Sequence, residues 1–391
     1  MRDLNPNFIN GDQSVGNIFS EMTRLALEHN AINLGQGMPD QDGPLKLRKI
    51  AAEEILKETG NQYVSPLGLP NLRQVIAKGN RDFYDLDSDP EKEILVTAGA
   101  TEALNISLRV LMAPGEKIAL FTPHYNFYND LIATNGLQPV YIPLSPPEWD
   151  FNADFLERQI KQNDVKTILL NTPSNPTGKV FSRQEMEDIA RIAKENDLFV
   201  ISDEVYEFLT SPDHPHIPIS SLDGMKERTI RISSAGKTFS FTGWRLGYLS
   251  APKDLMQALV KAHTITTFCL SAAFQEAVSQ GLSDIDFIKK LGPEFERKGK
   301  IFAEGLENTN FRILPNGGGY FAIADISGFE YDGSDADFAN RLVKEAGVAS
   351  LPLSAFYPEN QPVPAKMLRF CVAKEDKSLI EAAQRLKDFT L

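Results

Sequence analysis

The sequence of 391 residues predicts an α/β protein, in which helices cover a mostly parallel β-sheet beside a smaller α+β domain. From about Pro70 onward, short runs rich in β-branched residues alternate with helical patterns. These runs are apolar at consecutive positions, which is typical of strands buried on both faces of a sheet. After about Gly281 the alternation stops, and a charged helical stretch followed by short strand-like segments indicates the smaller domain.

Seven apolar runs are expected to supply the strands of the sheet. Between the fourth and the fifth run, an amphipathic pattern predicts a helix over 182–196, with Ser182 as its N-cap and Glu185 completing a capping box. The seven runs span residues 94–97, 118–121, 139–142, 167–170, 198–202, 229–233 and 246–250.

The second part of the chain is expected to contain helices over 285–308 and 378–389. Three consecutive glycines, Gly317 to Gly319, lie between them. Because they lack the preceding strand and the spacing of a dinucleotide-binding loop, we interpret them as a turn. The chain should therefore divide into an N-terminal arm that joins the small domain, a large domain and a small C-terminal domain, over 1–40, 41–284 and 285–391 respectively.

Composition excludes several classes of function. The formal net charge of -13 disfavours nucleic-acid and anionic membrane surfaces, which require clustered Lys and Arg. The two cysteines, Cys269 and Cys371, each lie in an apolar stretch, so we expect buried free thiols in a reducing compartment. The first 13 residues are polar and resemble no signal peptide, and no apolar run is long enough to cross a bilayer. We therefore expect a soluble cytoplasmic protein.

Polar side chains follow three of the predicted strands, at the edge of a parallel sheet where ligands collect. The segments are 171–178, 203–206 and 234–237, and they supply amide, carboxylate, phenol, hydroxyl and amine groups. Glycine precedes Lys237 and allows a ligand to approach, and a desolvated lysine there can act as a nucleophile that forms Schiff bases. Considered singly, Lys237 could be a surface charge and Asp203 a helix cap. The hypothesis of Schiff-base chemistry therefore depends on the combination of these groups.

A series of motifs resembles the class I and II aminotransferases, which depend on pyridoxal phosphate. The resemblance covers about residue 32 to the C-terminus, and it implies the aspartate aminotransferase-like fold with a seven-stranded sheet. The opening INLGQG (32–37) and the end LRFC (368–371) look closest to methionine and kynurenine/glutamine aminotransferases. The general motifs, in chain order, are TAGATEA (97–103), NPTG (175–178), DEVY (203–206), SSAGKTF (233–239) and TGWRLG (242–247).

The resemblance implies roles around the cofactor ring. Lys237 would hold pyridoxal phosphate as a Schiff base and then move the substrate's α-proton. Asp203 would keep the pyridine nitrogen protonated, while Tyr206 and Asn175 would bond the phenolic oxygen. Tyr125 would stack on the ring.

The resemblance also implies a phosphate site, which needs backbone donors at a helix start together with cations and hydroxyls. Several close relatives have lysine where this chain has Arg245, and either cation can bind a phosphate. Tyr63 resembles the tyrosine that reaches the phosphate of the neighbouring subunit, which implies a homodimer with shared active sites. The remaining phosphate ligands would be Gly99, Ala100, Thr101 and Ser234.

The same resemblance implies a substrate site without a metal. Arg369 would bind the α-carboxylate in a bidentate manner beside Asn175, and Gly37 would let the N-terminal arm close over the substrate. Ile18, Tyr125 and Phe356 would border the substrate side chain, and kynurenine-preferring relatives have tryptophan where this chain has Ile18. No motif places a second cation for the side chain of aspartate. We therefore expect an apolar, sulfur-containing or aromatic donor, methionine first, with glutamine or kynurenine as alternatives.

Two other functions fit parts of the pattern. A carbon–sulfur lyase acting on cysteine S-conjugates would use the same Lys237, and the ratio of amino transfer to pyruvate release would separate it from an aminotransferase. A ligand sensor on this fold would need a DNA-reading module, which we do not find before Ile32. The favoured hypothesis is an enzyme that acts on small amino acids and 2-oxo acids, with no nucleic-acid or membrane partner.

Overall fold

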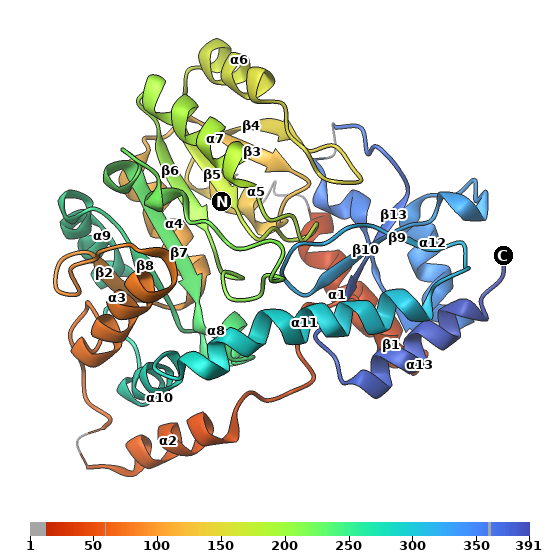
Figure 1. Cartoon of the computed structure of the whole chain (residues 1–391), viewed down its shortest axis with the longest axis horizontal. Helices are drawn as coiled ribbons and strands as arrows, with labels where there is room; N and C mark the ends of the chain where they lie inside the picture. Colours follow the sequence, from red (N-terminus) through yellow and green to blue (C-terminus); the bar gives the residue numbers. More distant parts are fainter. Residues whose placement is uncertain (1–12, 59, 359–360) are drawn as a thin grey trace, which may run out of the picture.

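The computed structural model describes residues 13–58, 60–358 and 361–391, and the polar first 12 residues lie outside this part. Its centre is a seven-stranded sheet in the order β2-β8-β7-β6-β5-β3-β4 (Figure 1). Only β8 runs antiparallel to its neighbours β2 and β7, so the sheet is mostly parallel as predicted. Each strand coincides with one of the seven expected runs, although the runs at 198–202 and 246–250 begin one residue before their strands. The strands are β2 (Ile94–Thr97), β3 (Lys117–Thr122), β4 (Gln138–Pro143), β5 (Val165–Asn171), β6 (Phe199–Asp203), β7 (Thr229–Ser234) and β8 (Gly247–Ser250).

The sheet is apolar on both faces because its alternate residues enter two different cores. Leu169 packs with the helices α4 (Gly99–Leu111), α5 (Phe127–Thr134) and α9 (Lys253–Thr266) on one face. Its neighbours Ile168 and Leu170 belong to the other core, which includes α6 (Ala153–Asn163) and α7 (Arg183–Glu195). A strand covered twice must be apolar at consecutive positions, which explains the seven runs.

The predicted capping box is present at α7. The Ser182 side chain accepts a hydrogen bond from the backbone of Glu185, and the Glu185 side chain accepts one from the backbone of Ser182. The expected helix over 285–308 is α11 (Ile285–Gly305), three residues shorter, and the final one is α13 (Asp376–Lys387), two residues earlier than expected at each end.

A second sheet of four antiparallel strands forms in the C-terminal part, in the order β12-β13-β10-β9. Gly317 to Gly319 precede β10 in an irregular segment, in agreement with the interpretation as a turn. The boundaries expected at residues 40 and 284 stay a prediction. The strands are β9 (Arg312–Ile313), β10 (Phe321–Asp325), β12 (Leu351–Pro352) and β13 (Met367–Cys371).

The N-terminal helix α1 (Gln13–Glu28) lies beside the second sheet in Figure 1. The following strand β1 (Ile32–Asn33) pairs in parallel with β11 (Val348–Ala349). The remaining α-helices are α2 (Leu45–Leu56), α3 (Pro70–Tyr84), α8 (Ala235–Thr238), α10 (Ala272–Leu282) and α12 (Asp335–Arg341). Short 3₁₀ helices span Ile219–Ser221, Lys226–Arg228, Thr242–Trp244, Ser327–Phe329 and Leu353–Phe356, and a π-helical segment spans Leu342–Ala346.

Two expectations from composition can be compared with the structure. Both cysteines are free, but only Cys371 is buried; Cys269 follows the end of α9 and is partly exposed, so the expectation of two buried thiols was wrong for it. Within the described ranges, every helix is too short or too polar to cross a membrane. The described residues also contain no group of three or more His, Cys, Asp or Glu side chains placed to hold a metal ion.

Candidate active site

A cavity of about 140 Å³ opens at the carboxyl ends of the parallel strands. Asn171 ends β5, Asp203 ends β6, and Lys237 lies in the short helix that follows β7, so neighbouring strands bring the three side chains together. The residues that line the cavity are Ala100, Thr101, Leu104, Tyr125, Tyr128, Asn171, Asn175, Asp203, Val205, Tyr206, Ser234, Lys237 and Arg245.

Asp203 is the only carboxylate among these lining residues, and it is 4% exposed. Burial raises the pKa of its carboxyl to about 6, although hydrogen bonds from the Tyr128 hydroxyl (2.7 Å) and the Val205 backbone (3.3 Å) favour the ionised form. The Asn171 amide donates to the Asp203 carbonyl oxygen at 2.9 Å and accepts from the backbone of Asn175 at 2.8 Å. These contacts fix a buried carboxylate that is ready to receive a cationic or protonated group.

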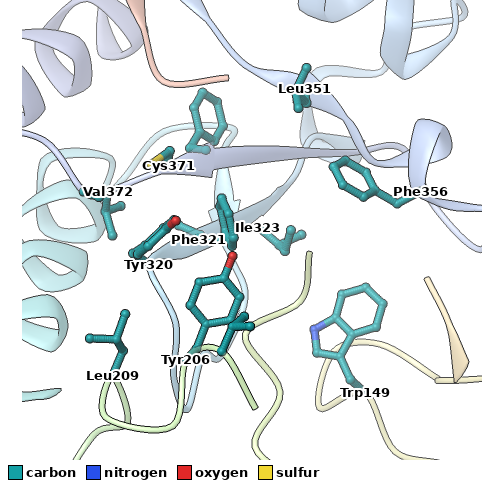
Figure 2. Packing of buried hydrophobic residues seen from close by; sticks show 14 of the residues in the cluster. Trp149, Tyr206, Leu209, Tyr320, Phe321, Ile323, Leu351, Phe356, Cys371 and Val372 are labelled. Atoms are coloured by element: carbon teal, nitrogen blue, oxygen red, sulfur yellow. The ribbon is translucent and has the colours of Figure 1, made fainter. Parts of the chain in front are cut away.

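Lys237 lies among aromatic side chains. Its Nζ donates a hydrogen bond of 3.0 Å to the hydroxyl of Tyr320, and it lies 5.8 Å from the ring centroid of Tyr206. Figure 2 shows Tyr206 and Tyr320 side by side with Phe321, and the two tyrosine rings meet edge to face with centroids 5.1 Å apart. Burial raises the pKa of the Tyr206 hydroxyl well above its usual range, so this phenol stays a neutral donor.

One end of the cavity is suited to an anion. Helix α4 begins there at Gly99, whose φ of 72° places it in the left-handed region. A Cβ at this position would lie 2.9 Å from Nη2 of Arg245, so another residue would displace the guanidinium and would also be strained by the positive φ. The first turn of the helix, Ala100 and Thr101, and the hydroxyl-bearing Ser234 line the same cavity. Unpaired backbone N–H groups at a helix start, next to an arginine, form a site for a phosphate.

Arg369 lies outside the lining of this cavity but close to it. It is in the middle of β13 and only 1% exposed. Its Nη1 donates to Oδ1 of Asn175 at 2.8 Å, and its Nη2 donates to the carbonyl oxygen of Gly35 at 2.7 Å. Phe321 and Phe356 cover the guanidinium, with centroids 4.1 and 4.7 Å away.

The charge of Arg369 lacks a compensating anion. Burial lowers the pKa of its guanidinium to about 10, and its Nε has no hydrogen-bond partner among the described residues. Its two acceptors are neutral oxygens, and none of the ion pairs of the described chain includes it. A buried cation without a carboxylate is costly, and an anionic ligand would remove that cost.

The other residues expected at the site have different surroundings. Tyr63 does not line the cavity; it is 83% exposed and packs edge to face on Phe268. Ile18 is half-buried against the core, while its neighbour Phe19 contacts the ring of Phe356 and lies 5.7 Å from the Arg369 guanidinium. Gly37 faces the ring of Phe321, which a Cβ would approach to 3.0 Å.

Sequence reasoning missed four residues with direct contacts in this region. Tyr128 could have been found, because it lies three positions after Tyr125, and its backbone N–H bonds the Tyr125 carbonyl oxygen at 3.0 Å in the turn that leads into α5. Asn171 was part of a quoted segment but received no role. Tyr320 and Phe19 gave no signal in spacing, since long-range packing alone brings them to Lys237 and Arg369.

These residues fit pyridoxal phosphate. An amine, a buried carboxylate and a neutral phenol border one cavity, with an anion site at one end and an uncompensated arginine nearby. Lys237 is the group that could bind the aldehyde, and Asp203 could pair with the ring nitrogen. Gly99 and Arg245 could provide the space and the charge for the phosphate.

Comparison with known proteins agrees with this assignment. Residues 29–386 match the family model described as aminotransferase class I and II. The chain is 38% identical over 379 residues to a probable N-succinyldiaminopimelate aminotransferase of Mycobacterium tuberculosis, covering 94% of this chain and 95% of the relative. It is 34% identical over 397 residues to kynurenine–oxoglutarate transaminase 3 of Rattus norvegicus, covering 95% and 87%. The solved structure of YbdL from Escherichia coli, described with a methionine aminotransferase function, matches with a TM-score of 0.94 at 32% identity, covering 100% of both chains.

Proposed function

Because the chain belongs to the class I and II aminotransferases, whose members depend on pyridoxal phosphate, we propose that it moves the amino group of an apolar, sulfur-containing or aromatic L-amino acid to a 2-oxo acid. Methionine is our first choice of donor. The family and the fold expected from the motifs are confirmed by the comparisons, while the substrate is our own inference. The observation that carries it is Arg369, a buried cation that forms no ion pair with the described residues and is enclosed by aromatic rings.

The cofactor would be held by the residues that border the cavity. Lys237 would bind it covalently, Asp203 would pair with its ring nitrogen, and Arg245 with the start of α4 would bind its phosphate. Tyr206 and Asn175 would hydrogen-bond its phenolic oxygen, and Tyr125 would lie against its ring. When bound, pyridoxal phosphate supplies an aldehyde that reacts with amines and a ring that withdraws electrons from the adjacent carbon.

The chain's own groups would then control proton position. Asp203 as a carboxylate keeps a proton on the group that it faces, and Tyr128 holds that carboxylate in place by its hydrogen bond. The Nζ of Lys237, once free, accepts the α-proton of the substrate and later returns a proton. Arg369 orients the substrate through its α-carboxylate, in the bidentate geometry that a guanidinium offers.

Selectivity should follow from what surrounds Arg369. Phe19, Phe321 and Phe356 are apolar rings, and the cations that line the described cavity, Lys237 and Arg245, already have roles toward the cofactor. A second carboxylate on the substrate would be left unpaired, at a cost of several kcal/mol. The site should therefore bind aspartate poorly. It should also bind N-succinyldiaminopimelate poorly, because the side chain of that compound contains further carboxylates.

A donor panel tests the proposal. Specificity constants would be measured at saturating 2-oxo acid for methionine, glutamine, phenylalanine, kynurenine, N-succinyldiaminopimelate and aspartate. We expect methionine first and aspartate lower by about a hundredfold or more. Pyruvate release from a cysteine S-conjugate, measured in parallel, should be slow relative to amino transfer. First place for aspartate or for N-succinyldiaminopimelate would contradict the apolar pocket, and dominant pyruvate release would instead identify a lyase.

The assembly and location are proposals too. We infer a homodimer with shared active sites because the exposed Tyr63 and Phe268 form an aromatic pair on the surface, where a second subunit could cover them. We place the protein in the cytoplasm, because both of its cysteines are unpaired.

A further inference from the structure

Tyr320 connects the lysine of the site with the N-terminal segment. Its hydroxyl accepts a hydrogen bond of 3.0 Å from Nζ of Lys237 and donates one of 3.1 Å to the carbonyl oxygen of Gly37. The three residues are far apart in the sequence, with 83 positions between Lys237 and Tyr320 and 283 between Gly37 and Tyr320. One phenol therefore links three separate parts of the chain.

The direction of these hydrogen bonds follows from the chemistry of a phenol. A tyrosine hydroxyl has one proton, and here that proton is directed to Gly37. Its oxygen is therefore left as an acceptor, which meets Nζ of Lys237 and also the hydroxyl of Tyr206. Burial raises the pKa of Tyr320 above its ordinary value, so the hydroxyl remains protonated and this polarity is maintained.

The ring of Tyr320 is also held firmly. It is fully buried, and Figure 2 shows the rings of Tyr206 and Phe321 beside it, with centroids 5.1 and 4.8 Å away. The ring of Phe295 also packs against it, with a centroid distance of 5.8 Å. The preceding Gly319 has a φ of 75° and donates its backbone N–H to the Leu209 carbonyl oxygen at 2.8 Å. A side chain fixed in this way can define the position of a flexible lysine.

We propose that Tyr320 is a positioning residue for Lys237, which holds the free Nζ between its proton transfers and couples it to the segment around Gly37. This inference rests on the proposed function of Lys237. When the Lys237 amine is free, it donates a hydrogen bond to the Tyr320 oxygen. The Tyr320 hydroxyl in turn donates a hydrogen bond to the Gly37 carbonyl oxygen and holds it in place. The segment that is expected to close over the substrate is thereby tied to the group that performs the proton transfer.

The test is Tyr320→Phe in the holoenzyme, which removes the hydroxyl and keeps the ring. Single-turnover rates would be measured with methionine and with α-deuterated methionine. We expect a rate about three- to tenfold lower, the equivalent of one hydrogen bond, with a larger deuterium isotope effect and an unchanged dissociation constant for methionine. Tyr141→Phe is the matched control, because its hydroxyl bonds Asn129 outside the cavity, and it should behave as the wild type.

A second readout does not depend on turnover. Hydrogen exchange of the backbone around Gly37 should become faster in Tyr320→Phe, because its carbonyl loses a partner, while Leu34 and Asp40 keep their own backbone bonds. If phenylalanine disturbs the fold, 3-fluorotyrosine at position 320 keeps the packing, weakens the acceptor and should change the isotope effect in the same direction.

The outcomes separate this inference from the proposed function. If Tyr320→Phe has the same single-turnover rate, isotope effect and hydrogen exchange as the wild type, the positioning role of Tyr320 is overturned. Equal loss of rate and of methionine affinity, with no change in the isotope effect, would also overturn it, since that result indicates a structural role. Borohydride reduction of the same samples reports on Lys237 independently, because failure to modify Lys237 would refute the proposed function itself.

Discussion

At the scale of single residues, the carboxyl group of Asp203 has the environment that most directly affects cofactor binding. Burial raises its pKa to about 6, and the Tyr128 hydroxyl opposes this shift. Without a ligand, the carboxyl therefore becomes protonated as the pH falls through about 6. A cationic ring nitrogen stabilises the carboxylate, so ligand binding and Asp203 ionisation favour each other.

This coupling predicts how Asp203→Asn will behave. The wild type should lose cofactor affinity relative to the variant as the pH falls from about 8 to about 5, because only the wild type has an ionisable group at this position. The ratio of the two dissociation constants, measured by absorbance titration, should therefore shrink toward one at low pH. The variant should also abstract the substrate proton more slowly by orders of magnitude. A ratio that stays constant over this pH range would contradict the pairing.

At the scale of elements, much of the large sheet was predictable from the sequence. A strand such as β5 alternates between two cores, so its apolar run is visible without any tertiary information. The cap of α7 is equally local, because Ser182 and Glu185 satisfy each other within one turn. Side chains at the ends of parallel strands were predictable for the same reason, since topology alone brings Asp203 and Lys237 to one edge.

The second sheet shows why the rest was not predictable. Arg369 was identified only through the family resemblance, because its place opposite Ile323 in the antiparallel pair of β13 and β10 depends on the folded small sheet. The contact between Tyr320 and Lys237 crosses from one sheet to the other, so no local pattern encodes it. No local pattern encodes the contact of Phe19 either, because Phe19 comes close to Arg369 only when helix α1 packs against a distant part of the chain. Proposals about substrate choice therefore depend more on the structure than proposals about the cofactor do.

At the scale of the whole molecule, Tyr63 lies on the surface of the subunit and outside the lining of the described cavity. It lies between α2 and α3, it is 83% exposed, and its ring contacts only Phe268 among the aromatic pairs of the described residues. Phe268 is itself 41% exposed, which is unusual for a large apolar side chain next to another. A partner subunit would bury both rings and bring Tyr63 toward a second active site.

Mixed dimers test this arrangement. Lys237→Ala chains and Tyr63→Ala chains should each have little activity alone. After subunit exchange, a hybrid dimer would contain one site with both intact groups, so part of the activity should return. Activity is measured after mixing, and exchange is verified by native mass spectrometry of tagged chains. Absence of recovery in samples that contain hybrid dimers would contradict a shared site.

Borohydride reduction tests most directly whether Lys237 binds the cofactor. Reduction converts the linkage between a lysine and pyridoxal phosphate into a stable adduct, which peptide mass spectrometry can locate. Lys237→Ala serves as the control, and it should lack the adduct while keeping a folded structure. We predict loss of the visible absorption band and a single modified residue, Lys237. An adduct on another lysine of the wild-type chain, or none in a preparation that contains the cofactor, would contradict the account.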